Sequence, residues 1–328
     1  MNHIARTLAA VSVSLALAAT AAAQPQRHWL DMRFGRQKTR VSFNSRGYWD
    51  REVKEQDTEM GLQRHEVRIA APIFQDETQE LSAGVAYTGW NVDTAAVLPD
   101  TGESFPSCLH DVRISMDYRR KLDNDWVWGA GVTVGSPSDR PFASNEEISV
   151  TARSFLRIPH GDRNAWLIML AFSNVRDFAP YVPLPGVGYH WRPNDRTSIL
   201  AGFPFSMVRW EPVEKLLVEA SWLMLRNVRA KVSYELLDGV RVYGLFEWDS
   251  ERFFRHDRGD EDDRLQYYEK RAGGGVEIEL HENITLDLSG GYAFDRFFFE
   301  ADEYDDRDEN RLELQDGAFA GVQVNFRF

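Results

Sequence analysis

Charged side chains recur at every second position along several segments of this chain, and this spacing is the first feature that could carry chemistry. Arg229, Lys231 and Glu235, for example, alternate with apolar residues between positions 228 and 236. Residues two apart lie on the same face of an extended strand. Ammonium, guanidinium and carboxylate groups on one wall can attract and orient polar solutes. The residues predicted to line such a wall are Arg113, Arg153, Arg157, Arg229, Lys231, Glu235, Arg241, Glu247, Glu277, Glu279, Asp287 and Arg327.

Two interpretations of these rows remain open. Rows of arginine that face rows of glutamate and aspartate could form a passage with a transverse electric field. The same rows could instead form a solvated or ion-paired wall with no transport role, because burying an unpaired charge costs much free energy.

Signals for enzymatic chemistry are weak. The eight histidines are scattered and form neither a His-Glu-x-x-His motif nor paired metal spacing, and no Gly-x-Ser-x-Gly occurs. The glycine run 273–275 is better explained as a bend or a close contact within a strand. The single cysteine, Cys108, excludes an internal disulfide. We therefore expect no catalytic residue, no cofactor and no metal site.

Two acidic segments, 257–263 and 302–309, support a separate hypothesis. They could bind divalent cations that also bridge lipopolysaccharide phosphates, although the glycine and spacing of a calcium-binding loop are absent. The alternative is a solvated loop that its charge keeps soluble.

The elements that would position these groups are strands. Period-two alternation covers 111–119, 148–158, 215–224, 228–236, 240–249, 276–280 and 284–294. Short polar turns at 122–125, 160–164, 192–196, 238–239 and 281–283 separate some strands, and Asp238-Gly239 is a strong hairpin signal. Longer segments at 91–107, 135–145, 250–264 and 296–311 separate others. We predict about 14 strands, with 12 or 16 as alternatives, because Pro204 and Pro212 interrupt 197–214.

The last eleven residues alternate strictly and end on an aromatic residue. Their apolar face includes Val322, Val324, Phe326 and Phe328. An exposed apolar row at a chain end is unfavourable in water but is solvated by lipid in a bilayer. This pattern resembles the terminal β-signal of bacterial outer-membrane barrels. The resemblance implies that these four residues serve as an assembly signal for the barrel-assembly machinery, and that lipid and lipopolysaccharide surround the barrel.

The first residues indicate export. Residues 1–23 contain one arginine and then an apolar run, and they end in three consecutive alanines, as in a secretory signal peptide cleaved after Ala23. Loss of Arg6 would change the formal net charge from −13 to −14. An acidic chain argues against nucleic acid as a partner. We divide the chain into a signal peptide (1–23), a leader (24–36) and a β-barrel (37–328).

Two further segments carry a family resemblance. Leu184 to Tyr189, followed by Leu200 to Pro204, resemble a family of predicted bacterial outer-membrane proteins of unknown function. The resemblance spans residues 60 to 328 and implies the barrel fold without implying a substrate.

Together these patterns predict an all-β protein, a single closed antiparallel transmembrane β-barrel in the bacterial outer membrane, with short periplasmic turns and long acidic external loops. Porin-like passage of small polar solutes through a charged lumen is the expected function. A non-conducting structural or surface-binding barrel and a hydrophobic-ligand transporter are the alternatives. A soluble sandwich, with the apolar faces of two sheets in contact, is the alternative fold. The sequence leaves the oligomeric state open.

Overall fold

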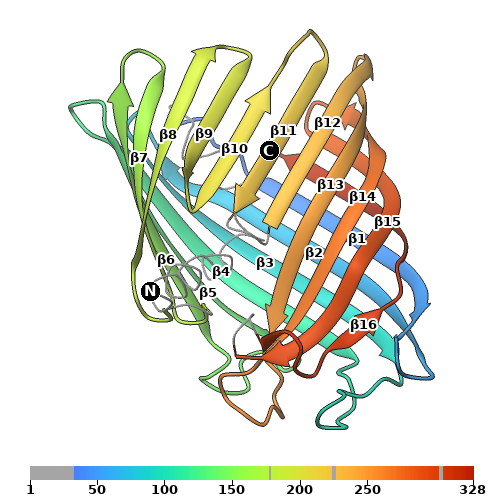
Figure 1. The fold of residues 1–328 in the computed structure, drawn as a ribbon. Helices are drawn as coiled ribbons and strands as arrows, with labels where there is room; N and C mark the ends of the chain where they lie inside the picture. Colours follow the sequence, from blue (N-terminus) through green and yellow to red (C-terminus); the bar gives the residue numbers. More distant parts are fainter. Residues whose placement is uncertain (1–32, 177–178, 224–226, 303–305) are drawn as a thin grey trace, which may run out of the picture.

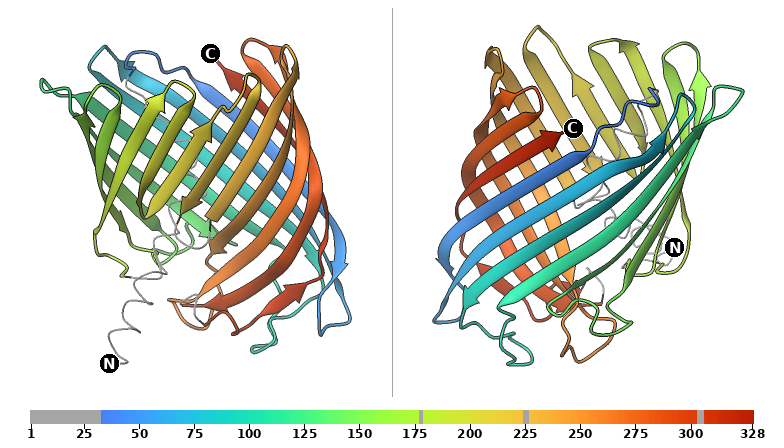
Figure 2. Two further views of the ribbon diagram at one scale, coloured as in Figure 1. Left: turned by 45° about the horizontal axis from the view of Figure 1, so that its top comes forward. Right: turned by 180° about the vertical axis from the view of Figure 1, so that it is seen from behind.

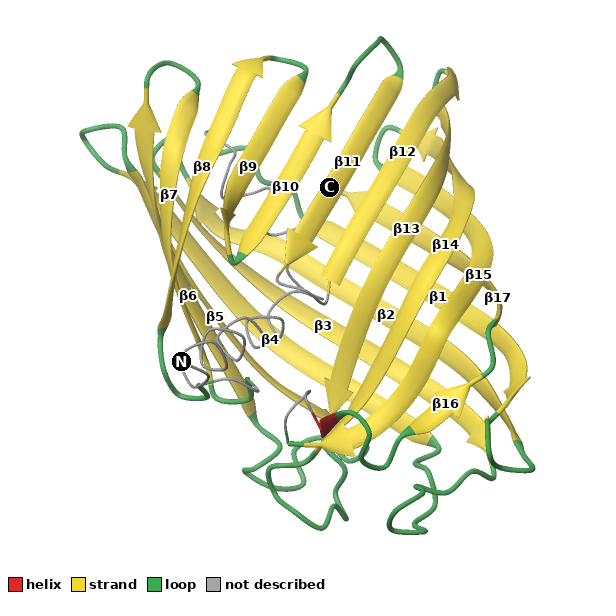
Figure 3. Ribbon diagram, in the orientation of Figure 1, coloured by secondary structure: helices red, strands yellow, loops and turns green. Residues whose placement is uncertain are grey.

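The computed structural model describes residues 33–176, 179–223, 227–302 and 306–328, and these residues form seventeen β-strands (Figures 1 and 3). No helix in these ranges is long and apolar enough to span a membrane. The strands are β1 Arg40–Glu52, β2 Glu59–Gln75, β3 Gln79–Thr94, β4 Cys108–Lys121, β5 Val127–Ser138, β6 Ser149–His160, β7 Asn164–Ser173, β8 Leu184–Asn194, β9 Thr197–Phe203, β10 Phe205–Trp210, β11 Leu216–Leu223, β12 Asn227–Leu237, β13 Val240–Phe253, β14 Arg264–His281, β15 Ile284–Ala301, β16 Leu312–Leu314 and β17 Gly317–Arg327.

Sixteen of these strands close into one antiparallel barrel. Neighbours in the chain pair from β1 to β15, β15 pairs with β17, and β17 pairs with β1. The short β16 pairs with β15 outside this ring. The estimate of about 14 strands was therefore wrong, although 16 lay within its range. Pro204 lies in the turn between β9 and β10, and Pro212 lies in the turn before β11, so both prolines end strands instead of interrupting them.

The alternation of the sequence sorts side chains between the two faces of this wall. Large apolar residues point outward and stay exposed, whereas charged residues on the same strands point inward. A single closed sheet replaces the two stacked sheets of a sandwich, so the outward apolar side chains meet no protein core. Exposed outward residues include Phe43, Ile69, Val85, Ile114, Val132, Ile168, Val187, Trp222, Val232 and Leu288.

The two ends of the barrel differ. One end carries short turns, such as 195–196, 238–239 and 282–283, and Gly239 adopts φ +75° in the Asp-Gly hairpin. The other end carries longer loops, including 95–107, 139–148 and 254–263. These loops are shorter than expected because the strands extend into the predicted loop segments, for example as far as Thr94 in β3 and Ala301 in β15.

β1 begins and β17 ends at the short-turn end (Figure 1). On β17, Val324 lies between Leu286 of β15 and Phe43 of β1 in the ladder, and Phe328 follows the strand with its side chain 66% exposed. Val322 and Phe326 share the face of Val324. The predicted signal peptide (1–23) lies outside the described residues, as does the leader before residue 33.

The wall has unequal height. β2, β14 and β15 contain 17, 18 and 18 residues, whereas β9, β10 and β11 contain 7, 6 and 8. Next to the short strands, the ladder between β12 and β13 ends at the pair of Val228 and Trp248. β13 continues beyond this pair to Phe253. Beyond it, Phe254 forms a parallel bridge with Ser138 at the end of β5. The high part of the wall therefore curls inward until β13 meets β5 (Figure 2).

A packed core fills the interior beneath this curl at the long-loop end. Trp90 of β3 and Tyr267 of β14 meet with ring centroids 4.9 Å apart, and Phe105 and Phe298 meet at 4.8 Å. Strands β3 and β14 are not neighbours in the ring, so these contacts cross the interior. Apolar residues that face inward from strands far apart in the ring thus close part of the lumen with their own side chains.

Candidate functional site

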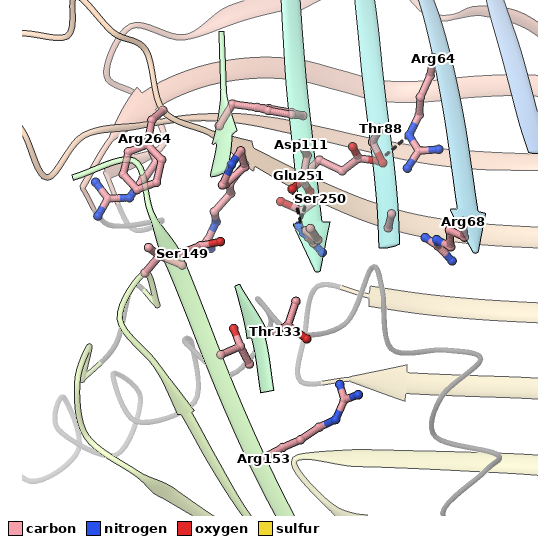
Figure 4. Close-up of a pocket in the computed structure, with 18 residues that line it drawn as sticks. Arg64, Arg68, Thr88, Asp111, Thr133, Ser149, Arg153, Ser250, Glu251 and Arg264 are labelled. Atoms are coloured by element: carbon pink, nitrogen blue, oxygen red, sulfur yellow. Dashed lines mark hydrogen bonds and ion pairs between the residues drawn. The ribbon is translucent and has the colours of Figure 1, made fainter. Parts of the chain in front are cut away.

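A pocket lies beside this core, between the inner faces of β2 to β6 and the end of β13 (Figure 4). Its position follows from the curl of the wall, because β13 crosses the lumen above strands that belong to the opposite side of the ring. The pocket is lined by Arg64, Arg68, Ala86, Thr88, Asp111, Arg113, Thr133, Pro137, Ser149, Thr151, Arg153, Val175, Ser250, Glu251, Arg252, Phe253, Phe254 and Arg264.

The lining is basic although the whole chain carries a net charge of −13. Six arginines and two carboxylates line the pocket. Several arginines pair with carboxylates that lie outside the lining: Glu66 pairs with Arg68, and Asp117 pairs with Arg153. Arg68 and Arg153 therefore line the cavity, whereas the carboxylates of Glu66 and Asp117 do not. The excess of positive charge in the lining produces a positive potential, which favours anions.

Glu251 connects the two sides of the pocket. Its carboxylate accepts a hydrogen bond from Arg64 Nε at 2.7 Å and another from Trp90 Nε1 at 2.9 Å. Arg64 also donates to Glu66 at 2.8 Å through Nη1. These bonds tie β13 to β2 and β3 across the lumen, and the low exposure of both Arg64 and Glu251 reduces competition from water.

Two of the residues predicted to line the lumen come together here. Arg113 of β4 donates to Asp111 at 2.8 Å through Nε, and Arg153 of β6 donates to Asp117 at 2.6 Å through Nη2. Each pair joins side chains that share the inner face, as the alternation predicts. The two arginines line the same pocket from strands that are not adjacent.

Arg157 lies four residues further along β6, nearer the short-turn end, and is also on the inner face. It is 6% exposed, and its Nε has no hydrogen-bond partner among the described residues. Its neighbours in the ladder are Val127 on one side and Leu167 on the other, both buried in an apolar cluster with Phe155. A buried guanidinium in such surroundings gains free energy from any anion that reaches it.

The other predicted residues form an ion-paired wall on β12 to β15. Arg241 donates to Glu277 at 2.9 Å, and Tyr243 donates to Asp287 at 2.5 Å. These groups therefore neutralise one another along this wall. Further pairs in this wall include Arg229 with Glu247 (3.2 Å), Lys231 with Glu277 (3.4 Å) and Arg241 with Glu235 (3.6 Å).

Glu279 and Arg327 lie apart from both groups. They are exposed at the short-turn end, where the backbone N–H of Glu279 donates to Gly239 and that of Arg327 donates to Asn283. They contribute to the rim of the barrel and not to the pocket.

Sequence reasoning missed the pocket residues on β2 and β13, namely Arg64, Arg68, Glu251 and Arg252. The pattern was present, since Arg64, Glu66 and Arg68 alternate with His65 and Val67. No local pattern, however, indicates that residue 251 reaches across the lumen to residue 64.

The two acidic loops lie close together at the long-loop end. Burial raises the pKa of Asp263, and the neighbouring carboxylates of Asp260, Asp302 and Glu309 raise it further. Within the described parts of these loops, and elsewhere in the described chain, no three His, Cys, Asp or Glu side chains are arranged to hold a metal ion.

No family model matches the chain, and no curated protein matches its sequence. Among solved structures, the chain is similar to a mutant of the monoaromatic hydrocarbon channel TodX, with 11% identity, a TM-score of 0.45, and coverage of 97% of this chain and 96% of the other. It is also similar to an outer-membrane channel from Pseudomonas putida F1 (9% identity, TM-score 0.39, 91% and 98% covered). A third is the β domain of the Bordetella autotransporter BrkA (9%, 0.34, 88% and 99%).

Proposed function

We propose that this protein is an outer-membrane channel that admits small polar solutes and prefers anions. In this proposal the apolar outer face contacts lipid, the short turns face the periplasm, and the long loops face the cell exterior. We also propose that Val322, Val324, Phe326 and Phe328 form the segment that the barrel-assembly machinery recognises.

The observation that carries the proposal is the arginine-lined pocket on the inner face of β2 to β6. Its lining extends from the external ends of strands, at Ser149 and Arg264, to the middle of β2, at Arg68. Arg153 and then Arg157 continue the basic surface along β6 toward the periplasmic end. Anions that enter at the loops would meet successive guanidinium groups, which provide fixed positive charge along the path.

A non-conducting barrel is the second candidate, and one observation favours it. The contacts of Trp90 with Tyr267 and of Phe105 with Phe298 fill much of the external end. Any passage must therefore run beside this core, through the pocket, and not along the axis of the barrel.

A hydrophobic-ligand transporter is a third candidate, supported by the apolar inner cluster of β5 to β10. Phe155, Leu167 and Leu200 are all at most 3% exposed, and Phe34 packs with them. The arginines that border this cluster on β6 favour ligands with negative charge over neutral hydrocarbons.

The reversal potential of single channels in planar lipid bilayers under a KCl gradient tests the proposal. We expect stepwise currents. Their reversal potential should be displaced from zero toward the equilibrium potential of chloride. In Arg153→Glu the reversal potential should move toward the equilibrium potential of potassium. The substitution places a carboxylate in the lining of the pocket, next to the carboxylate of Asp117.

Arg163→Glu is the matched control, because Arg163 lies in a short turn with its side chain half exposed and pairs there with Asp195. It should leave the reversal potential unchanged. Membranes without stepwise currents, or a wild-type channel that prefers potassium, would refute the proposal.

A further inference from the structure

We propose that the pocket binds the phosphate group of small soluble anions, through a row of hydroxyl side chains that lies between arginines. This inference rests on the proposed function only in requiring that anions reach the pocket. It names a narrower substrate class than small anions in general, namely inorganic phosphate and soluble phosphate esters.

The first observation is a row of hydroxyl side chains on the inner face of the wall. Ser115 of β4 pairs with Thr133 of β5 in the strand ladder, and Thr133 pairs with Thr151 of β6. Thr151 pairs in turn with Ser173 of β7. We call these four residues the hydroxyl row. Thr133 and Thr151, at its centre, line the pocket and are partly exposed.

The spacing of the row suits an anion with several oxygen atoms. Opposite residues of adjacent antiparallel strands have Cβ atoms about 5 Å apart. The hydroxyl groups of Thr133 and Thr151 can therefore bind two oxygen atoms of one phosphate group. A threonine hydroxyl donates one hydrogen bond and can also accept one, so it can bind either a charged or a protonated phosphate oxygen.

The second observation is the position of Arg153 next to the hydroxyl row. Arg153 of β6 and Asp117 of β4 both pair with Gly131, which lies between them on β5. Their side chains meet across this glycine, where Arg153 Nη2 donates to Asp117 at 2.6 Å. A Cβ at Gly131 would lie 3.1 Å from Arg153 Nε, so the guanidinium group lies over β5. Thr133 is the next inward residue of β5, about 7 Å along the strand, and lines the same pocket (Figure 4).

Arginines also lie on the other side of the hydroxyl row, toward the long-loop end. Arg68 of β2 pairs with Ala86, which pairs with Arg113 of β4. Arg113 pairs in turn with Gly135 of β5, and a Cβ at Gly135 would lie 2.8 Å from Arg113 Cγ. The small residues therefore leave room for the arginine side chains. Arg68, Arg113 and Arg153 all line the pocket, so the hydroxyl row has arginines on both sides.

The combination favours phosphate over chloride and over carboxylates. Thr133, Thr151 and the guanidinium group of Arg153 form a triangle and not a line. The diverging oxygens of a tetrahedral phosphate can meet all three groups, whereas the two oxygens of a carboxylate lie in one plane. Guanidinium groups bind phosphate through paired hydrogen bonds, and the excess of arginines over carboxylates in the lining favours a doubly charged anion.

The line width of inorganic phosphate in phosphorus NMR spectra tests this inference independently of any current. The titration uses the full-length purified protein in micelles of a phosphate-free detergent, and we expect saturable broadening. Thr133→Val keeps the shape of the side chain and removes its hydroxyl. It should weaken phosphate binding about tenfold, the ratio for the loss of one hydrogen bond to a charged group. Thr133→Ser, which keeps a hydroxyl, should restore most of the affinity.

Thr285→Val is the matched control. Thr285 lies on the face of β15 opposite to the outward Leu288, and therefore on the inner face, but it does not line the pocket. The substitution should leave the dissociation constant of phosphate unchanged. The heat-modifiable gel band checks that each variant is folded. Succinate, at a pH where both anions carry two charges, should compete with phosphate at least about tenfold more weakly than phosphate itself.

Three results would overturn the inference. One is equal phosphate affinity of the wild type and Thr133→Val, which would show binding by charge alone. Another is equal affinity for succinate and phosphate. The third is tighter binding of dihexanoyl phosphatidic acid than of glycerol 3-phosphate, which would show that the ligand is a lipid headgroup.

The NMR and current measurements separate this inference from the proposed function. If phosphate fails to bind while currents remain anion-selective, only this inference falls. If phosphate binds to a barrel that carries no current, the proposed channel falls and the inference stands.

Discussion

At the scale of single residues, the interior of this barrel shows how charges are tolerated where water is scarce. Arg64 and Glu251 are both largely buried, yet each makes two polar contacts: Arg64 with Glu66 and Glu251, and Glu251 with Arg64 and Trp90. Such multiple hydrogen bonds offset the desolvation of both ions. The pair also joins strands that are not neighbours, so it helps to hold the inward curl of β13 in place.

Arg64→Leu should therefore destabilise the folded barrel. The substitution leaves Glu251 and Glu66 buried without their common partner, and removal of one member of a buried ion pair typically costs about 3 kcal/mol. Urea titration of the protein refolded into lipid vesicles, followed by tryptophan fluorescence, measures the free energy of unfolding.

Arg163→Leu is the control for this stability measurement. Arg163 and Asp195 are 50% and 84% exposed, and the loss of such a surface pair should change stability by less than about 1 kcal/mol. Equal effects of the two substitutions would mean that the pair across the lumen does not form.

At the scale of elements, the β14–β15 hairpin depends on close approach of two glycine segments. A Cβ at Gly273 would lie 2.4 Å from the carbonyl oxygen of Gly290 and 3.0 Å from Cα of Gly291, and neither backbone atom can move aside easily. The glycine run noted in the sequence thus marks a close contact within the wall, one of the two explanations considered for it.

Gly273→Val should disrupt this hairpin, and the protein should lose the compact, heat-modifiable band that folded barrels show on gels. Gly244→Val is the comparison, since a Cβ at Gly244 has no neighbour nearer than 3.9 Å. That variant should keep the band. Retention of the band in Gly273→Val would show that the hairpin tolerates a side chain at this contact.

The alternation of the sequence predicted the strands, the short turns and the inward face of the wall, because these depend on residues close together in the chain. The Asp238-Gly239 hairpin and the inward position of Arg153 illustrate this. The strand count was wrong because Pro204 lies in a turn that separates two strands, β9 and β10. The sequence alone does not indicate whether the chain turns at this proline. The arrangement of the pocket could not be predicted, because the contact of Phe254 with Ser138 joins residues more than a hundred positions apart.

At the scale of the whole molecule, the barrel is closed in its backbone but divided in its interior. A packed aromatic core occupies one side of the long-loop end, and the arginine-lined pocket lies beside it. The opposite wall, β12 to β15, is mutually ion-paired. The proposed path is therefore off the axis and follows β2 to β6, where arginines outnumber carboxylates in the lining of the pocket.

The most direct test of this path is the current through single Thr151→Cys channels before and after a negatively charged, thiol-specific sulfonate reagent is added. Thr151 lines the pocket, and the native cysteine is removed by Cys108→Ser. Val150→Cys serves as the control, because its side chain points to the opposite face. We predict a stepwise fall in current for Thr151→Cys and none for Val150→Cys. An unchanged current in Thr151→Cys, with its thiol shown to be modified, would contradict it.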